Sequence, residues 1–140
     1  MARVKKAVVD ASVVVKWFNQ ENYTEDALRL RSDYADRRID LVAPYFLLYE
    51  VGNALRYNPD FGVEDVQSAI MDLLKIQIDL RLLDEEQIKL ASSLAYNLGV
   101  TLYDAAYLAI ASREGVRLIT ADERLVAKVG PKLAMHVKDY

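Results

Sequence analysis

Short hydrophobic segments alternate along the chain with longer stretches in which apolar residues recur every three or four positions. The short segments have the length and apolar content of buried β-strands, and the longer ones have the periodicity of amphipathic helices. The segments expected to be strands are 4–9, 40–43, 80–83, 116–119 and 133–137. Strands that alternate with helices and are joined by short loops predict an α/β sandwich built around a parallel sheet.

The helices are located by their apolar faces and by residues that begin or end helices. They are expected from near Ser12 and over 24–38, 44–57, 63–74, 88–98, 102–114 and 122–129. Thr24 is a suitable N-cap, and Pro44 suits the first turn of a helix because it lacks a backbone N–H. Gly99 and Gly115 follow two of these helices and suit left-handed caps.

Length and composition fit a single domain. The chain has 140 residues, 53% of them hydrophobic, which is enough apolar material for one core. Neither an internal repeat nor a low-complexity segment divides it, and we expect one domain over residues 1–140. A run of about eighteen apolar residues and a signal-peptide pattern are both lacking, so we expect no membrane contact and a cytoplasmic location.

Composition narrows the possible chemistry. The chain has no cysteine and one histidine, His136. The absence of cysteine excludes disulfides and thiolate chemistry, and a single histidine cannot form a multi-histidine metal site. Its 21 acidic residues leave metal binding through oxygen ligands open. A net charge of −3 argues against a protein that coats nucleic acid by bulk electrostatics, but it does not exclude an RNA-cleaving enzyme.

Four acidic residues stand out by their positions. Asp10 ends the first expected strand and Asp122 follows the fourth, while Glu50 and Asp104 lie on helices with mostly apolar neighbours. Ligands of parallel α/β sheets bind beyond the carboxyl ends of the strands, so Asp10 and Asp122 are expected to be neighbours. Ser12, two residues after Asp10, is placed to orient its carboxylate.

Each of these acids also fits a purely structural role. Asp10 and Asp122 suit N-caps of the helices that follow them. Asp104 follows Thr101 with the spacing of a capping box, and Glu50 fits a solvated face of a half-buried helix. Taken together, a shared site is the more economical interpretation, because clustered carboxylates repel one another unless a cation lies between them. Mg²⁺ or Mn²⁺ is the expected cation, since both prefer oxygen ligands.

The order and spacing of four motifs carry a family resemblance. They are Val8-Val9-Asp10-Ala11-Ser12, Pro44-x5-Glu50-x2-Asn53-x-Leu55, Leu102-Tyr103-Asp104-Ala105-x-Tyr107-x-Ala109 and Leu118-Ile119-Thr120-Ala121-Asp122-x2-Leu125. The set resembles the PIN-domain family, and is most similar to the VapC-type toxins of prokaryotic toxin-antitoxin pairs. The resemblance covers nearly the whole chain. It departs from the family mildly, at Ser12, where threonine is also common, and at Leu125, where an aromatic residue is frequent.

The resemblance implies a three-layer α/β/α sandwich with a central parallel sheet and a metal-dependent endoribonuclease activity. It further implies a homodimer and inhibition by a VapB-type antitoxin. The acidic cluster that binds metal would be Asp10, Glu50, Asp104 and Asp122. The supporting polar groups would be Ser12, Asn53 and Thr120. We then expect a metal-bound water to attack an RNA phosphodiester, with a 5′ phosphate and a 3′ hydroxyl as products.

Contacts to RNA and competing functions are less clearly indicated. Residues near the motifs that suit phosphate contact or base stacking are Lys16, Trp17, Arg56, Tyr103 and Arg124, although core packing is the favoured role for Trp17. The main alternative function is a catalytically idle interaction protein with the same fold. A phosphotransferase is disfavoured because Asp-x-Ser replaces Asp-x-Asp, and a dinucleotide-binding domain because no Gly-x-Gly-x-x-Gly occurs.

Overall fold

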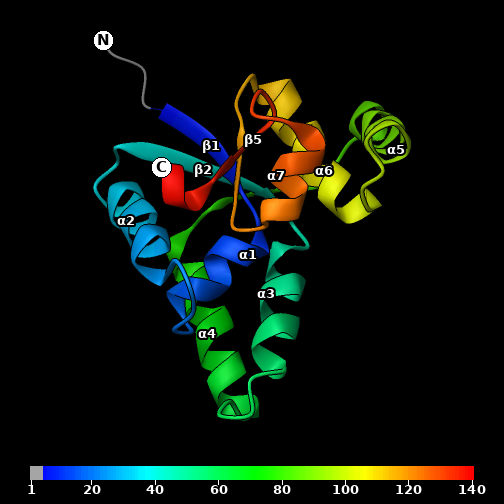
Figure 1. Cartoon of the computed structure of the whole chain (residues 1–140). Coiled ribbons are helices and arrows are strands. Elements are labelled where there is room, and N and C mark those ends of the chain that lie inside the picture. Colours follow the sequence, from blue (N-terminus) through cyan, green and yellow to red (C-terminus); the bar gives the residue numbers. More distant parts are fainter. Residues whose placement is uncertain (1–4) are drawn as a thin grey trace.

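A five-stranded parallel sheet forms the centre of the computed structural model, which describes residues 5–140 (Figure 1). The strands are β1 (Lys5–Val9), β2 (Ile39–Pro44), β3 (Asp79–Arg81), β4 (Leu118–Thr120) and β5 (Ala134–His136). They lie in the order β3-β2-β1-β4-β5, and every neighbouring pair is parallel. The chain therefore builds outward from β1 in one direction, and then returns to add β4 and β5 on the other side.

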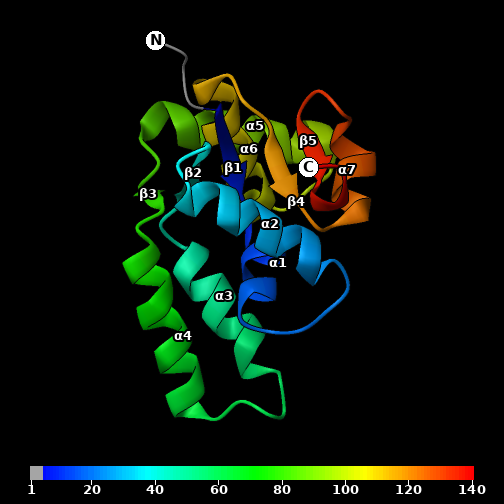
Figure 2. The same ribbon diagram turned by 90° about the vertical axis from the view of Figure 1, so that its left-hand side faces the viewer.

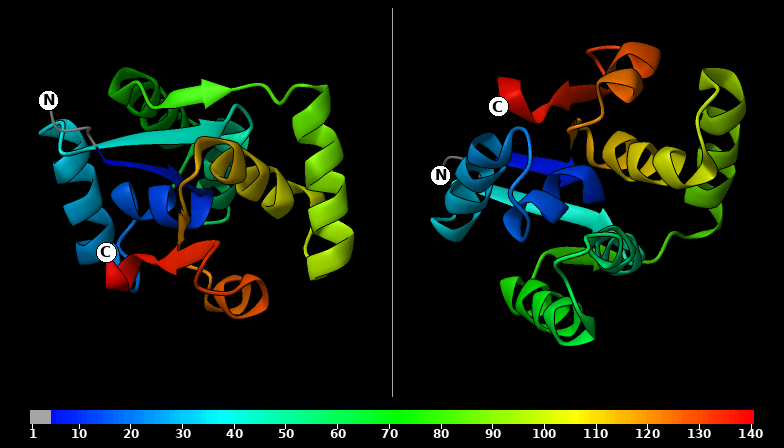
Figure 3. Two further views of the ribbon diagram at one scale, coloured as in Figure 1. Left: turned by 90° about the horizontal axis from the view of Figure 1, so that it is seen from above. Right: turned by 60° about the horizontal axis from the view of Figure 1, so that its bottom comes forward.

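Helices cover both faces of this sheet, which confirms the three-layer α/β/α sandwich. They are α1 (Ala11–Val14), η1 (Val15–Trp17), α2 (Thr24–Ala35), α3 (Leu47–Arg56), α4 (Val63–Ile76), α5 (Glu85–Leu98), α6 (Leu102–Glu114), α7 (Glu123–Val129) and η2 (Val137–Asp139). Helices α1 to α4 lie on one face, and α6 and α7 lie on the other (Figures 1 and 2). Helix α5 packs beside α6, away from the sheet (Figure 3).

The core lies on both sides of the central strands. Val8 and Val9 of β1 and Leu118 of β4 are fully buried, because helices cover both faces at this point. Residue Val8 pairs with Leu118 on one side and with Val42 on the other, so apolar side chains line up across the sheet. Continuous apolar strands are typical of parallel sheets covered on both faces.

Local sequence explains most helix ends. Gly99 and Gly115 end α5 and α6 with φ angles of 68° and 67°, in the left-handed region that glycine adopts without strain. The expected helix start at Pro44 is wrong, because Pro44 ends β2 and α3 begins at Leu47. Proline is tolerated there because the pairing of β2 with β1 ends at Val42, so Pro44 pairs only with Arg81 of β3.

The start of α2 also differs from the expected one. Thr24 is the first residue of α2 and not its N-cap, and its hydroxyl instead accepts a hydrogen bond from the Glu21 backbone N–H at 2.8 Å. Tyr23 is the N-cap residue, with a φ of 68°. The first expected strand began at Val4, which lies outside the described residues.

The topology gathers polar side chains at one edge of the sheet. Asp10 follows β1, Thr120 ends β4 and His136 ends β5, and all three strands point the same way. This edge includes the point where the strand order reverses, which is where parallel α/β proteins form their binding crevices. Across residues 5–140, none of the helices combines the length and the apolar character required to span a bilayer.

Candidate active site

Asp10 is the most deeply buried acid of this edge, with 6% of its surface exposed. Its Oδ1 accepts two hydrogen bonds from Ser12, at 3.1 Å from the backbone N–H and 2.5 Å from the hydroxyl. The first of these bonds caps α1, so the capping interpretation is confirmed. A carboxylate can accept several bonds at once, so capping leaves Asp10 able to bind a cation.

Ser12 and Thr120 connect the end of β1 to the end of β4. The Ser12 hydroxyl lies 3.2 Å from the Thr120 hydroxyl and accepts a 2.8 Å hydrogen bond from the backbone N–H of Ala121. The Thr120 hydroxyl in turn accepts a bond from the backbone N–H of Asp122 at 3.1 Å. These bonds link the segments that carry Asp10 and Asp122, which holds the two strand ends in fixed register.

Glu50 enters the site from α3 on the same side as α1. It is half-buried, and its Oε1 accepts a 2.7 Å hydrogen bond from the hydroxyl of Tyr107 on α6. Tyr107 is 1% exposed, and its ring packs edge-on against that of Phe46, with ring centroids 5.5 Å apart. A rigidly packed aromatic side chain therefore fixes the orientation of the Glu50 carboxylate.

Asp104 and Asp122 lie at the first turns of helices on the opposite side. The backbone N–H of Asp104 donates to the Thr101 hydroxyl at 3.0 Å, as the expected cap of α6 requires. Asp122 is the N-cap of α7, and its Oδ1 accepts bonds from the backbone N–H groups of Arg124 and Leu125 at 3.0 and 3.1 Å. Both acids thus occupy positions where the helix dipole favours negative charge.

The four carboxylates influence one another electrostatically. Burial raises the pKa of Asp10 to about 6, against partial compensation from the Ser12 and Thr120 hydroxyls, and the charges of Asp104 and Glu50 raise it further. Burial and the Asp104 charge also raise the pKa of Glu50, although the Tyr107 hydroxyl lowers it. Burial and the Asp122 charge raise the pKa of Asp104. The site therefore concentrates negative charge that a cation would neutralise.

The donor set of this site suits a hard divalent ion. All four groups are carboxylates, and Mg²⁺ and Mn²⁺ prefer oxygen ligands. Among residues 5–140, no three acidic or histidine side chains already stand close enough together to share one metal ion. The site in this structure is therefore an electrostatically coupled cluster, in which metal binding requires side-chain adjustment.

Several residues expected to contact RNA or to support the site are buried or lie in other parts of the structure. Trp17 is buried, and its Nε1 donates to the Ala27 carbonyl at 2.8 Å, so it packs in the core and base stacking by Trp17 is excluded in this conformation. Lys16 is also buried, and pairs with Glu21 at 3.1 Å. Asn53 is exposed and lines a hollow between α3 and α4 with Tyr49 and other residues, so its supporting function stays a prediction.

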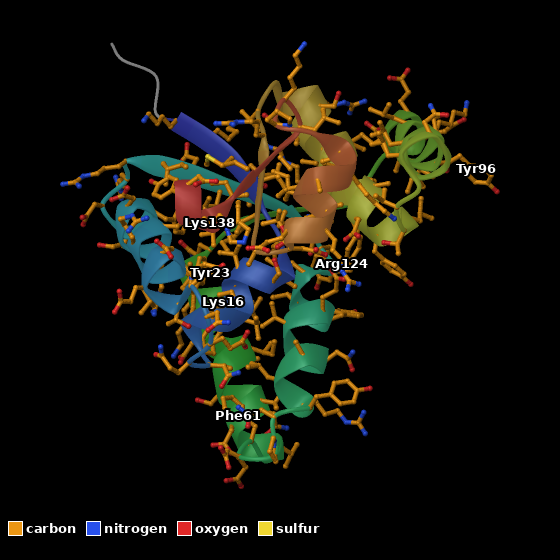
Figure 4. All side chains as sticks on the ribbon, viewed as in Figure 1. Lys16, Tyr23, Phe61, Tyr96, Arg124 and Lys138 are labelled. Atoms are coloured by element: carbon orange, nitrogen blue, oxygen red, sulfur yellow. The ribbon has the colours of Figure 1, made fainter. Side chains whose placement is uncertain are left out.

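The remaining candidates for RNA contact are accessible. Arg56, Tyr103 and Arg124 are exposed, and Figure 4 shows Arg124 near the start of α7. Tyr103 also packs edge-on against Phe46 with ring centroids 5.5 Å apart, which places its ring beside the Glu50 helix. Contact of these three residues with RNA therefore stays a prediction.

Sequence reasoning did not assign the partner of Glu50. Tyr107 belongs to the third motif, but it lies 57 positions from Glu50, and no local pattern in the sequence indicates their contact. The signal that could have found it is a hydroxyl within the otherwise apolar face of α6, because a buried hydroxyl needs a partner. The polar group formed by Tyr23, Glu123, His136 and Lys138 was likewise missed.

The fold and the site together define a class of protein: an α/β/α sandwich with a cluster of carboxylates at the carboxyl edge of its parallel sheet. Comparison with known families identifies that class. The model of the PIN domain matches residues 7–130. The chain therefore belongs to the PIN-domain family, as its four motifs predict.

Individual relatives agree with this assignment. The chain is 34% identical to Ribonuclease VapC3 of Pyrobaculum aerophilum over 128 residues, which covers 88% of this chain and 94% of that protein. It is 35% identical to Ribonuclease VapC1 of Mycobacterium tuberculosis over 130 residues, which covers 89% and 92% of the two chains. The crystal structure of PAE2754 from Pyrobaculum aerophilum is similar, with a TM-score of 0.66 and 27% identity, and the match covers 99% of this chain and 94% of that one.

Proposed function

We propose that this protein is a metal-dependent endoribonuclease that cleaves RNA phosphodiester bonds. The observation that carries the proposal is the convergence of Asp10, Glu50 and Asp104 from three different parts of the chain on one edge of the sheet, where burial raises the pKa of each and the charges of Glu50 and Asp104 raise that of Asp10 further. Capping of α1 accounts for Asp10 alone, and bringing further carboxylates to the same partly buried place costs free energy that a bound cation would offset. Similarity to two proteins named as ribonucleases supports RNA as the substrate.

Asp10, Glu50, Asp104 and Asp122 are proposed to hold Mg²⁺ or Mn²⁺ as the cofactor. When bound, the ion would supply a water of lowered pKa and would stabilise negative charge on the phosphate. The carboxylate oxygens and their raised pKa values fit such an ion, because a cation restores the charged form.

The surrounding residues are proposed to position these carboxylates. Ser12 and Thr120 hold Asp10 at the junction of β1 and β4. Tyr107 holds Glu50 through a bond that a phenylalanine could not make. Asn53 lies one helical turn after Glu50 and is assigned a supporting function on that spacing alone. Such outer contacts typically change metal affinity by about 10- to 100-fold.

The biological setting is also part of the proposal. We infer that residues 1–140 act as one nuclease domain and form a homodimer. Membership of the family and the similarity to VapC proteins support a toxin of a toxin-antitoxin pair, inhibited by a VapB-type antitoxin in the cytoplasm. Co-purification from the native operon should retain a small second chain, and light scattering at micromolar concentration should give a dimeric mass.

The decisive experiment measures cleavage of a panel of single-stranded and structured RNAs with Mg²⁺, Mn²⁺ or EDTA. The wild type is compared with Asp104→Asn and with Asp72→Asn, a matched control on the exposed surface of α4. We expect metal-dependent cleavage by the wild type and by Asp72→Asn, and a loss of at least 100-fold in Asp104→Asn.

Equal activity in all three proteins would identify a contaminating nuclease and would refute the proposed site. Absence of cleavage by the wild type on every RNA, together with absence of Mn²⁺ binding, would favour the alternative of a catalytically idle PIN-domain interaction protein.

A further inference from the structure

A second polar cluster lies beside the acidic site, at the carboxyl ends of β4 and β5. It consists of Tyr23 before α2, Glu123 at the start of α7, His136 at the end of β5 and Lys138 in η2. Figure 4 shows Tyr23 and Lys138 close together in the view, on neighbouring elements. Three segments of the chain thus meet next to Asp122, around Tyr23, Glu123 and the C-terminal residues His136 and Lys138, and none of the four proposed metal ligands is part of the cluster.

Three donors of this cluster converge on one carboxylate oxygen. The Tyr23 hydroxyl donates to Glu123 Oε1 at 3.1 Å, and Lys138 Nζ donates to the same atom at 3.4 Å. His136 Nε2 faces it at 4.0 Å. The Tyr23 ring also packs edge-on against the His136 ring, with centroids 4.7 Å apart, so the two aromatic donors hold each other in place.

His136 provides the most informative detail. Its Nδ1 accepts a 3.0 Å hydrogen bond from the backbone N–H of Lys138, so in the neutral ring the proton lies on Nε2. That Nε2 is buried, and it is the single buried side-chain polar atom without a partner among residues 5–140. Native proteins hydrogen-bond nearly all of their buried polar groups, so an unpartnered buried donor is evidence for a ligand that accepts from it.

The cluster resembles a phosphate-binding site that an internal carboxylate occupies. Phosphate oxygens accept hydrogen bonds from groups of these three kinds: an ammonium, a phenol and an imidazole N–H. Glu123 reaches into their midst with only one oxygen, at distances of 3.1 to 4.0 Å, and leaves the buried His136 donor unsatisfied. A phosphate group carries more acceptor oxygens than a carboxylate, and can approach all three donors together.

We propose that Tyr23, His136 and Lys138 form a phosphate subsite for the RNA substrate, which the Glu123 carboxylate occupies in the free protein. The subsite would take a backbone phosphate next to the one that is cleaved, because Glu123 directly follows Asp122. This inference rests on the proposed ribonuclease function, and assigns part of the substrate surface that the acidic cluster leaves undefined.

Glu123 is well placed to leave when RNA arrives. Its side chain is 61% exposed, and that of Lys138 is 45% exposed, so solvent already reaches the pair. Exposed ion pairs contribute little to stability, so breaking this one costs the protein little. His136 at the floor is 4% exposed and stays fixed, and the Tyr23 backbone holds a φ of 68°, in a region that few non-glycine residues adopt.

A structural tie and a metal ligand are the competing roles for Glu123, and each predicts a different effect of its replacement. If the cluster only ties α2 to α7, replacing Glu123 should lower the melting temperature and leave RNA affinity unchanged. If Glu123 is instead a further metal ligand, the same replacement should weaken metal binding and cleavage. The phosphate subsite predicts that removal of the competing carboxylate strengthens RNA binding.

The experiment measures RNA affinity by fluorescence anisotropy in the cleavage-deficient Asp104→Asn background with Mg²⁺ at several salt concentrations. We expect Glu123→Gln to tighten binding about three- to tenfold. We expect Lys138→Gln to weaken it by a similar factor, and to lower the salt slope by about 1. Tyr23→Phe should weaken binding without a change of charge, and should reduce the gain from Glu123→Gln when the two are combined.

Matched controls separate the subsite from general electrostatics. Asp139→Asn removes one negative charge from the residue next to Lys138, and Lys132→Gln removes one positive charge from the turn before β5. Both residues are exposed, and each variant should change affinity less than twofold. Melting temperatures of all variants, measured in parallel, identify any variant that is unfolded. If one of the charge variants does not fold, Tyr23→Phe still tests the subsite, because it removes only a hydroxyl group.

Cleavage assays on proteins that keep Asp104 distinguish the two proposals. If the wild type cleaves RNA, and Lys138→Gln raises KM with little change in kcat, the subsite is supported. If it cleaves RNA but Glu123→Gln binds RNA no better than Asp139→Asn does, the subsite is wrong and the ribonuclease stands. If it neither cleaves nor binds any RNA, both proposals are wrong.

Discussion

At the scale of single residues, Ser12 connects the two strands that carry the site. Its hydroxyl contacts the Asp10 carboxylate, the Thr120 hydroxyl and the Ala121 backbone at once. We expect Ser12→Ala to lower Mn²⁺ affinity by about tenfold, because Asp10 loses its orienting bond. Ser12→Thr keeps the hydroxyl and should retain affinity within about threefold. Titration calorimetry checks both variants, and equal loss in the two would show that the hydroxyl is not the cause.

Asp10 should make the metal-free protein sensitive to pH. Its pKa of about 6 lies above the value of 3.8 for an exposed aspartate, so the folded chain holds this proton more tightly than the unfolded chain. The contribution of Asp10 to the free energy of unfolding is therefore greatest below about pH 4 and declines as the pH rises to about 6. The penalty above that pH is about 3 kcal/mol.

Asp10→Asn removes this penalty. In EDTA at pH 7.5 the variant should unfold at higher urea concentration than the wild type, and at pH 4 the two should be nearly equal. Asparagine keeps an oxygen that accepts the Ser12 bonds, so packing is largely conserved. A stability difference that does not change between pH 4 and 7.5 would contradict the raised pKa.

At the scale of elements, an ion-pair network fixes the far end of α6. Glu114 pairs with Lys6 of β1 at 3.0 Å and also with Arg81 of β3, and these partners lower the pKa of Glu114. A lowered folded-state pKa means that this stabilisation is present above about pH 4.5 and is lost as the pH falls further. The network thus ties α6 to two strands of the sheet at neutral pH.

We expect Glu114→Gln to destabilise the protein by about 1 kcal/mol at pH 7 and by less at pH 3. The matched control is Glu85→Gln, whose partner Lys89 lies one turn away on the exposed face of α5. That control should cost less than about 0.5 kcal/mol. Chemical denaturation at both pH values measures the difference, and equal effects of the two substitutions would show that the network contributes little.

Secondary structure followed the sequence pattern closely, and the discrepancies have physical causes. The glycine caps of α5 and α6 were predictable because the left-handed conformation favours one residue type. The start of α3 was not, because Pro44 is compatible with both a strand end and a helix start. Only the pairing of Pro44 with Arg81 in the neighbouring strand decides between them.

At the scale of the whole molecule, a divalent ion should stabilise the fold. The four carboxylates come from both faces of the sheet, so an ion that they share would link the two helical layers. We expect millimolar Mg²⁺ or Mn²⁺ to raise the melting temperature of the wild type by several degrees, since a ligand of the native state stabilises it. Asp104→Asn should show a much smaller shift, and an equal shift in both would place the ion elsewhere.

The sequence by itself determined the order of strands and helices, the caps that Asp10, Asp122 and Thr101 provide, and the four carboxylates that suit a metal. These features depend on neighbours within a few positions, which periodicity and capping rules describe. Only the tertiary structure decided that Tyr107 holds Glu50 across 57 positions, and that Tyr23 meets Glu123 across 100. Such contacts arise because parallel strands bring distant segments to one edge of the sheet, and no local pattern records which side chains then touch.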